Sequence, residues 1–151
     1  MEDQKLTFKY IEGFPEPKEL EELTRLYCLL FEDAAVPFFK DRMTTKENIV
    51  AVLAYDSQSL IAFKIGYRYN ETTFYSWVGG VLPKYRRQGI AKLLAEKQEF
   101  LVKNMGYTIL RTKSMNCFKP MIMLNIKNGF DITQVYINEK GQRKIVFEKE
   151  I

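Results

Sequence analysis

The stretch Val81–Ala91 constrains the fold more than any other part of the sequence. It predicts the end of a strand, then a short basic turn, then a helix that begins after Gly89. The first backbone N–H groups of a helix have no partner within the helix, and the helix dipole adds partial positive charge there. Gly89 lets the backbone approach a ligand closely, and Ala91 keeps the next turn narrow. The stretch therefore indicates a binding site for an anionic group.

Two arginines strengthen this interpretation, because Arg86 and Arg87 carry the charge and the donors that suit phosphate. The pattern is Arg-x-x-Gly-x-Ala, which has neither the Gly-Lys-Ser/Thr of a Walker loop nor the three glycines of a dinucleotide fingerprint. A plain basic turn before an ordinary helix accounts for the same pattern, so the sequence alone leaves both interpretations open.

The charge of the chain is unevenly distributed. Residues 84–119 contain 9 basic and 2 acidic side chains (net +7), whereas residues 1–60 contain 7 basic and 12 acidic ones (net −5). A basic segment centred on the proposed site favours an anionic ligand. We do not expect nucleic-acid binding, because the positive charge gathers around one turn and no recognition motif is present. The acidic first third suits a cationic partner, although solvated helix faces account for it equally well.

Length and composition exclude several other classes. A chain of 151 residues predicts one domain, residues 1–151. No apolar run reaches the ~20 residues that span a bilayer, so we expect no membrane association. The start, Met1–Lys5, lacks the pattern of a secretory signal, which favours a cytoplasmic protein. The chain has no histidine, and its two cysteines, Cys28 and Cys117, have no metal-ligand spacing, so no metal site is expected.

Hydrophobic periodicity and turn residues predict a mixed α/β chain in the order β α α β β β α β α β β. The expected strands are 5–11, 49–55, 60–69, 73–82, 107–113, 131–137 and 143–149. The expected helices are one that begins at Pro17 in a region closed by Pro37, a short one over 38–43, one from Gly89 to Asn104, and an apolar one over 120–128. Paired glycines inside a strand, Gly79–Gly80, predict a bulge or a close backbone approach by a ligand.

Taken together, these features resemble a known family, the GCN5-related N-acetyltransferases (GNAT). Arg86-x-x-Gly89-x-Ala91 is similar to the family's pyrophosphate-binding loop. Val81-Leu82-Pro83 resembles the end of its fourth strand, and Gly79–Gly80 falls where that strand is usually bulged. Asn116 stands where the family often has an asparagine near the coenzyme, and Asn128-Gly129-Phe130 resembles the end of its fourth helix.

The resemblance implies a single-domain acyl-CoA N-acyltransferase fold, with a mixed sheet of about seven strands and four helices. It implies that acetyl-CoA is the co-substrate and lies between the fourth and fifth strands. The implied coenzyme-binding residues are Val81, Leu82, Arg86, Arg87, Gln88, Gly89, Ile90, Ala91 and Asn116. A backbone N–H near Gly80 or Val81 would polarise the thioester carbonyl, and an amine would attack directly without a covalent enzyme intermediate.

Two departures from the family pattern concern catalysis. The family often has a tyrosine five residues before the helix-ending Phe130 that protonates the departing thiolate, and here that position is Asn125. An amide donates a hydrogen bond to sulfur but is no acid at neutral pH, and an Asn that only solvates the helix end is an equal alternative. The fourth strand also lacks the glutamate base of some members. Candidates for the base are Tyr75, Ser76, Glu32 and Asp33, each of which is more ordinarily a surface or packing residue.

The acceptor implied by the resemblance is a primary amine. Aromatic residues and carboxylates around the first two helices suit a cationic acceptor, although core packing explains most of these aromatics equally well; they are Tyr27, Phe31, Phe38, Phe39 and Trp77, with Glu32. Without a histidine to activate it, Cys117 is expected to be a buried structural thiol. The alternative function is a non-catalytic acyl-CoA-binding sensor or interaction module. The apolar last strands are open to pairing in a homodimer.

Overall fold

The structure, a computed structural model, describes residues 5–151. Its strands are β1 (Leu6–Glu12), β2 (Val50–Asp56), β3 (Ser59–Arg68), β4 (Thr73–Val81), β5 (Ile109–Met115), β6 (Asp131–Ile137) and β7 (Arg143–Glu150). Its helices are α1 (Pro17–Leu30), α2 (Val36–Thr45), α3 (Ile90–Asn104) and α4 (Lys119–Lys127), with a short 3-10 turn, η1 (Pro83–Tyr85), after β4. The expected element order is therefore confirmed. Residues 1–4, which belong to the segment inspected for a secretory signal, lie outside the described part of the chain.

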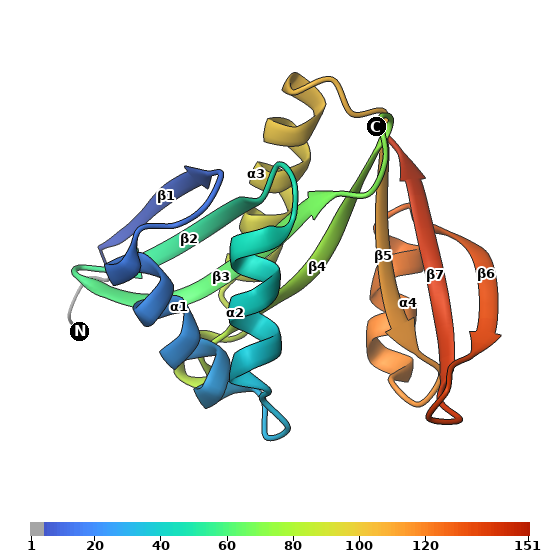
Figure 1. Cartoon of the computed structure of the whole chain (residues 1–151), viewed down its shortest axis with the longest axis horizontal. Coiled ribbons are helices and arrows are strands. Elements are labelled where there is room, and N and C mark those ends of the chain that lie inside the picture. The colour runs from blue at the N-terminus through green and yellow to red at the C-terminus, as the bar shows by residue number, and fades with distance from the viewer. Residues whose placement is uncertain (1–4) are drawn as a thin grey trace.

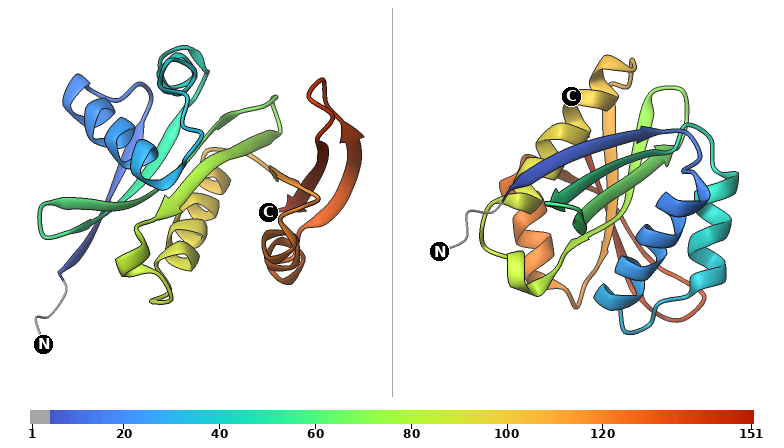
Figure 2. Two further views of the ribbon diagram at one scale, coloured as in Figure 1. Left: turned by 90° about the horizontal axis from the view of Figure 1, so that it is seen from below. Right: turned by 90° about the vertical axis from the view of Figure 1, so that its left-hand side faces the viewer.

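The strands form one mixed sheet in the order β1-β2-β3-β4-β5-β7-β6 (Figure 1). All neighbouring strands are antiparallel except β4 and β5, which run parallel. Helices α1 and α2 cover one face, and α3 and α4 lie on the other (Figure 2). The predicted seven-stranded mixed sheet with four helices is thus confirmed. Within residues 5–151, no helix is long and apolar enough to cross a membrane.

Two expected boundaries are wrong. Pro37 was expected to close the first helical region, but it lies in the first turn of α2, where its missing N–H would have had no helical partner. The strand expected at 107–113 is β5, which begins at Ile109. Tyr107 instead turns into the core, where its ring lies 5.4 Å from that of Phe74. Tertiary packing therefore overrides the local strand signal at this position.

The neighbouring strands β2 and β3 contribute to the core on both faces of the sheet, as their continuous apolar sequences favour. Leu53 and Phe63 pack against Leu23 of α1 on one face. Val52 and Leu94 belong to a second cluster beneath α3 on the other face. Because both faces of β3 are buried, β3 has a fixed position in the core. Strand β4 pairs with β3 along almost all of its length, so the position of β4 is fixed as well.

The bulge of β4 lies at Trp77. Ile65 of β3 pairs with Val78, whereas the next residue, Gly66, pairs with Ser76, so Trp77 is the extra residue of β4. A Cβ on Gly66 would lie 2.3 Å from Cε1 of the neighbouring Phe74 ring. The absence of a side chain at Gly66 therefore allows the two strands to stay paired beside the bulge.

The bulge expected at Gly79–Gly80 is wrong, since both glycines pair regularly with β3. Their glycine character reflects close approach by the protein itself. A Cβ on Gly79 would lie 2.9 Å from the carbonyl oxygen of Phe63, and one on Gly80 would lie 2.7 Å from Cδ1 of Leu30. Through Leu30, α1 packs directly on the second half of β4.

The parallel pair β4–β5 holds together over one end only. Thr73–Tyr75 pairs with Ile109–Arg111, and one further bond runs from Oγ1 of Thr112 to the carbonyl oxygen of Ser76 at 3.1 Å. Beyond that point the strands diverge toward their carboxyl ends (Figure 1). We call this divergence the β4–β5 fork. It leaves backbone groups on both strands without a strand partner, which is the condition for an extended ligand to pair there.

One core residue of α3 conflicts with its surroundings. The side chain of Gln98 is fully buried, and neither its Nε2 nor its Oε1 has a hydrogen-bond partner within residues 5–151. A buried amide without partners costs stability. We predict that Gln98→Met raises the free energy of unfolding by about 1–2 kcal/mol, because it keeps the side-chain length and removes both polar atoms. Urea unfolding measures this change.

Gln58→Met is the matched control, since Gln58 is exposed in the β2–β3 turn. It should change the free energy of unfolding by less than about 0.5 kcal/mol. A Gln98→Met variant that is less stable than the parent chain would show that the amide contributes an interaction rather than a penalty.

Candidate active site

The basic turn predicted from the sequence joins β4 to α3 through η1. Two residues of the turn are in the left-handed region, Arg87 with φ 62° and Gly89 with φ 78°. This conformation suits glycine but is uncommon for arginine, so the backbone at Arg87 is strained in the way often found at binding loops. A Cβ on Gly89 would meet no atom within 4 Å. The left-handed backbone conformation therefore favours glycine at position 89, and the space in front of the helix is open.

The N-terminus of α3 is open to an anion. Gly89 is the N-cap, no side chain caps the helix, and the first turn contains no acidic residue. The amide of Leu93 donates to the carbonyl oxygen of Gly89 at 3.0 Å, so the amides of Ile90, Ala91 and Lys92 precede the first helical bond. These unpartnered donors, with the helix dipole behind them, form an anion-binding end.

Three contacts hold the turn in place. The hydroxyl of Tyr85 donates to a carboxylate oxygen of Asp56 at 2.6 Å, and this bond raises the pKa of Tyr85. Nε of Arg86 donates to the carbonyl oxygen of Val81 at 3.0 Å. Ile90, the first residue of α3, is buried in the core cluster on this face of the sheet. Arg86 therefore has a positioning role that the sequence did not suggest: it ties the turn to the end of β4 through Nε and leaves its other nitrogens for an anion.

The end of β4 presents a backbone donor toward the fork. The amide of Leu82 donates to the carbonyl oxygen of Ile61 on β3 at 2.9 Å. Because successive residues of a strand point their N–H groups to opposite sides, the amide of Val81 faces away from β3, toward the fork. The predicted residues Val81 and Leu82 thus differ in what they present, since only Val81 offers a backbone donor on the open edge.

The two asparagines singled out in the sequence lie on the β5 side of the fork. Asn116 follows β5 and is exposed, and its Oδ1 accepts a hydrogen bond from Nζ of Lys119 at 2.8 Å, which leaves the amide NH₂ free to donate. Asn125 is the buried residue of α4, with 9% of its surface exposed. Within residues 5–151 its side-chain amide has no hydrogen-bond partner, so its donors and its acceptor are available to a ligand.

The face of the fork beneath α2 is aromatic, as the sequence suggested, but its charge is basic. Phe39 and Trp77 pack with ring centroids 5.6 Å apart. The guanidinium of Arg42 lies over the rings of Phe38 (4.5 Å) and Trp77 (5.4 Å). The expected carboxylate, Glu32, is exposed in the α1–α2 loop and makes no ion pair among the described residues. The cation of this surface thus comes from the protein.

Comparison with known proteins agrees with this geometry. The model of the acetyltransferase (GNAT) family matches residues 12–122, a range that includes β4, the basic turn, α3, β5 and the start of α4. The chain belongs to the acetyltransferase (GNAT) family. No curated protein is significantly similar to the sequence.

Several solved structures share the fold of this GNAT chain. A GNAT-family acetyltransferase from Elizabethkingia anophelis with acetyl-CoA bound superposes with a TM-score of 0.75 at 22% identity, covering 97% of this chain and 98% of that one. Ard1 from Thermoplasma volcanium gives 0.77 at 17% identity, covering 95% and 97%. The ribosomal-protein-S18-alanine N-acetyltransferase from Escherichia coli gives 0.75 at 17% identity, covering 95% and 94%. At these identities the likeness establishes a common fold.

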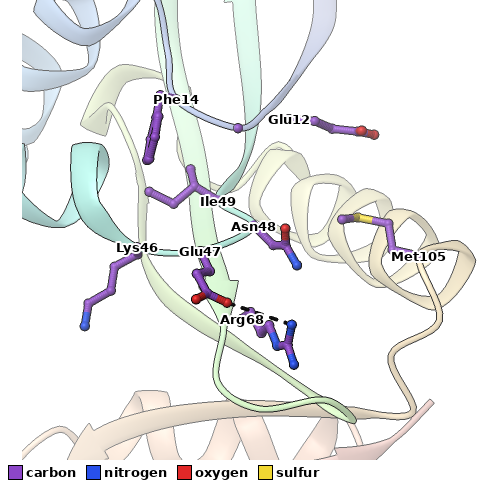
Figure 3. Close-up of a pocket in the computed structure, with 9 residues that line it drawn as sticks. Glu12, Phe14, Lys46, Glu47, Asn48, Ile49, Arg68 and Met105 are labelled. Carbon is purple, nitrogen blue, oxygen red and sulfur yellow. Dashed lines mark ion pairs between the residues drawn. The ribbon is translucent and has the colours of Figure 1, made fainter.

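A separate pocket of this GNAT chain lies at the opposite end of the sheet from the basic turn. It has a volume of about 530 Å³, and its wall includes Glu47, Asn48, Arg68 and Met105 (Figure 3). Glu47 and Arg68 form an ion pair at 3.8 Å across it. The pocket lies where β2 begins, β3 ends and α3 ends, so it is at the opposite end of α3 from the N-terminus of that helix. We therefore do not assign it to the acetyl-transfer site.

The expectation for Cys117 is partly wrong. Both cysteines are free, but Cys117 is exposed in the turn before α4 rather than buried. No group of three or more His, Cys, Asp or Glu side chains in residues 5–151 is arranged to hold a metal ion. Sequence reasoning also missed Arg42, although its spacing of four residues from Phe38 on one helix face was a detectable signal.

Proposed function

We propose that this chain is an N-acetyltransferase that moves the acetyl group of acetyl-CoA to a primary amine of a small molecule, peptide or protein. The observation that carries the proposal is the open N-terminus of α3 beside a strand edge that has no partner. The first feature suits a pyrophosphate, and the second suits the extended pantetheine arm. The GNAT structure from Elizabethkingia anophelis, which has acetyl-CoA bound, supports the choice of ligand.

Different residues of the site would bind different parts of acetyl-CoA. The amides of Gly89, Ile90 and Ala91 would receive the pyrophosphate, and the side chains of Arg86 and Arg87 would add charge. Gln88, exposed between Arg87 and Gly89, has a side-chain amide available to the same ligand. Across the fork, Asn116 would donate from its NH₂ group, while Leu82 packs beneath the end of β4.

Bound acetyl-CoA supplies an activated acetyl thioester. The amide of Val81 is placed to donate to the thioester oxygen, which becomes more negative during attack. The amine nitrogen forms a bond to the acetyl carbon, and the C–S bond breaks. An ammonium acceptor and acetyl-CoA thus give an amide, free coenzyme A thiol and one proton. Holding both reactants on one edge reduces the entropy cost of this step.

The groups near the fork favour hydrogen-bond donation over proton abstraction. Burial raises the pKa of Tyr75 to about 12, so its phenol stays protonated at neutral pH and acts as a donor. Ser76 is buried, and Glu32 and Asp33 are exposed in the α1–α2 loop. We propose that the neutral amine is the reacting form and that water carries the proton away.

Asn125 is proposed to orient the departing thiolate through its side-chain amide. Because an amide is no acid, we predict that Asn125→Ala lowers kcat only modestly, by much less than a thousandfold (about 4 kcal/mol). Release of free thiol, followed with a colorimetric reagent, measures the effect. Asn128→Ala is the control, since Asn128 is exposed at the end of the same helix. A larger loss for Asn125→Ala would show that Asn125 has a greater role than orientation.

The alternative is a non-catalytic acyl-CoA-binding module, and the lack of an evident base around the fork favours it. Calorimetry with acetyl-CoA, then thiol release with a panel of amines, separates the two functions. Binding with amine-dependent thiol release supports the transferase. Binding without release from any amine supports the module. A complete lack of binding contradicts both proposals.

A further inference from the structure

A surface of mixed aromatic and basic residues lies on the α2 side of the sheet, where β4 leaves β5. We call it the cationic cluster and define it by Arg42, Tyr67, Tyr75, Trp77, Arg111 and Lys113. The residues come from α2, β3, β4 and β5, so the fold alone brings them together. Tyr75 pairs with Arg111 at the last position before the fork, which places the cluster directly at its vertex.

Arg42 is the central cation of the cluster. Its Nη1 donates to the hydroxyl of Tyr67, and its guanidinium carbon lies 5.8 Å from the centre of that ring and 5.4 Å from that of Trp77. No carboxylate of residues 5–151 lies within ion-pair distance of Arg42. Its one described hydrogen bond leaves further N–H donors of the planar guanidinium available.

The β5 side of the cluster adds a second surplus cation. Nζ of Lys113 lies 5.7 Å from the ring centre of Tyr75 and 5.6 Å from that of Tyr136, and it also has no carboxylate partner in the described chain. Arg111 differs, because it pairs with Glu148 at 3.5 Å.

Two carboxylates that adjoin this surface are already engaged in ion pairs. Glu148 is paired with Arg111, and Glu47 with Arg68 at 3.8 Å. Lys46 adds a further cation, 5.3 Å from the ring centre of Tyr67. The hydroxyl of Tyr67 accepts from Arg42 and still has its own O–H to donate, so the surface offers positive charge and donors, while no carboxylate among the described residues pairs with Arg42 or Lys113.

From this imbalance we infer that the cationic cluster binds a carboxylate carried by the acceptor, so that the acceptor is an amine with a negatively charged group close to it. The inference rests on the proposed function, since an anionic coenzyme on the α3 side of the sheet leaves the α2 side of the fork to the acceptor. It replaces the cationic acceptor suggested by the sequence. A cationic acceptor would meet Arg42 and Lys113 without a free carboxylate between them.

A guanidinium that lies between aromatic rings is well suited to this ligand, because it binds a carboxylate through two parallel N–H donors. Two sources of carboxylate fit the chemistry: the α-carboxylate of a free amino acid, and an acidic side chain near the N-terminus of a peptide. These two sources are distinguished by testing acceptors of both kinds, each beside a matched acceptor that lacks the carboxylate.

The test uses the whole chain with acetyl-CoA and acceptors that differ only in charge. One set is an amidated tetrapeptide whose second residue is Asp, Asn or Lys. The other is free alanine beside alanine amide. Thiol release gives kcat/KM for each acceptor. Trp77 is the single tryptophan of the chain and belongs to the cluster, so its fluorescence, together with calorimetry, reports binding even without turnover.

We expect the carboxylate-bearing member of at least one set to be favoured over its cationic or neutral partner about tenfold or more, which is about 1.4 kcal/mol. Arg42→Gln should reduce this preference to within about threefold, whereas Arg42→Lys should retain part of it because the charge remains. Lys40→Gln is the matched control, since it removes one positive charge from an exposed position of the same helix and should leave the preference unchanged.

Each outcome decides one point. Turnover that favours the Lys peptide or alanine amide would overturn the inference and support the transferase. Selective binding of a carboxylate-bearing acceptor without thiol release would support the inference and contradict the transferase. An absence of both heat and fluorescence change with every acceptor would overturn the inference. Equal loss of preference in Arg42→Gln and Lys40→Gln would attribute selectivity to overall charge and also overturn it.

Discussion

The double variant Arg86→Ala, Gly89→Glu is expected to abolish binding of acetyl-CoA while the domain stays folded. The glutamate places a negative charge in the open space before α3, where the pyrophosphate is proposed to lie, and it forces a side chain into a backbone conformation with φ 78°. Removal of the arginine releases the tie to Val81 and removes a phosphate donor. Affinity should fall at least a hundredfold, about 2.7 kcal/mol, in calorimetry with acetyl-CoA.

Gly106→Glu is the control for this experiment. Gly106 follows the other end of α3, has φ 99°, and would meet no atom with an added Cβ. The backbone strain is therefore comparable, at about 1–2 kcal/mol, but the substitution is far from the anion-binding end. Circular dichroism should show a folded chain in both variants. An unchanged affinity in the double variant would remove the basis for placing the coenzyme on this turn.

Features encoded by a few neighbouring residues were predictable from the sequence. The turn after β4 and the start of α3 depend on Gly89 and on the periodic helix after it, and both signals are local. The helix-ending Gly129 likewise has φ 91°, in agreement with its expected role. Element order was predictable for the same reason, because each strand or helix carries its own period and its own terminating residues.

Features that depend on pairing between distant segments were not predictable. The bulge at Trp77 is defined by the register of β4 against β3, and nothing in the sequence of β4 separates Trp77 from Gly79–Gly80 as its position. The basic character of the α2 side of the fork was not predictable for the same reason. Arg42 and Lys113 are 71 residues apart in the sequence, and both reach the β4–β5 fork only through the packing of α2 on the sheet and the pairing of β5 beside β4.

Strand β4 therefore connects the open edge at Val81 with the cationic cluster. The geometry of β4 at the bulge depends on Gly66 of β3. Beyond the bulge, Val81 turns its amide away from β3 toward the β4–β5 fork, while Tyr75 and Trp77 before and within the bulge belong to the cationic cluster. A change that separates β3 from β4 here should disturb the fold itself, because β3 contributes to the core on both faces of the sheet.

Gly66→Ala is accordingly expected to destabilise the protein by about 3 kcal/mol or more, a large part of the stability of an ordinary domain. Its Cβ would lie 2.4 Å from the carbonyl oxygen of Tyr75 as well as 2.3 Å from the buried ring of Phe74, and a backbone atom cannot move without breaking ladder hydrogen bonds. Urea unfolding measures the loss.

The same substitution at Gly80 separates strain from the simple addition of a methyl group. The nearest atom to a Cβ on Gly80 is Cδ1 of Leu30, 2.7 Å away, and this is the flexible end of a side chain that can rotate aside. Gly80→Ala should therefore cost clearly less than Gly66→Ala, about 1 kcal/mol. Equal losses for the two variants would mean that the backbone beside the bulge can adjust. Gly66 would then not fix the register of β4, which places the amide of Val81 and the cationic cluster on one strand.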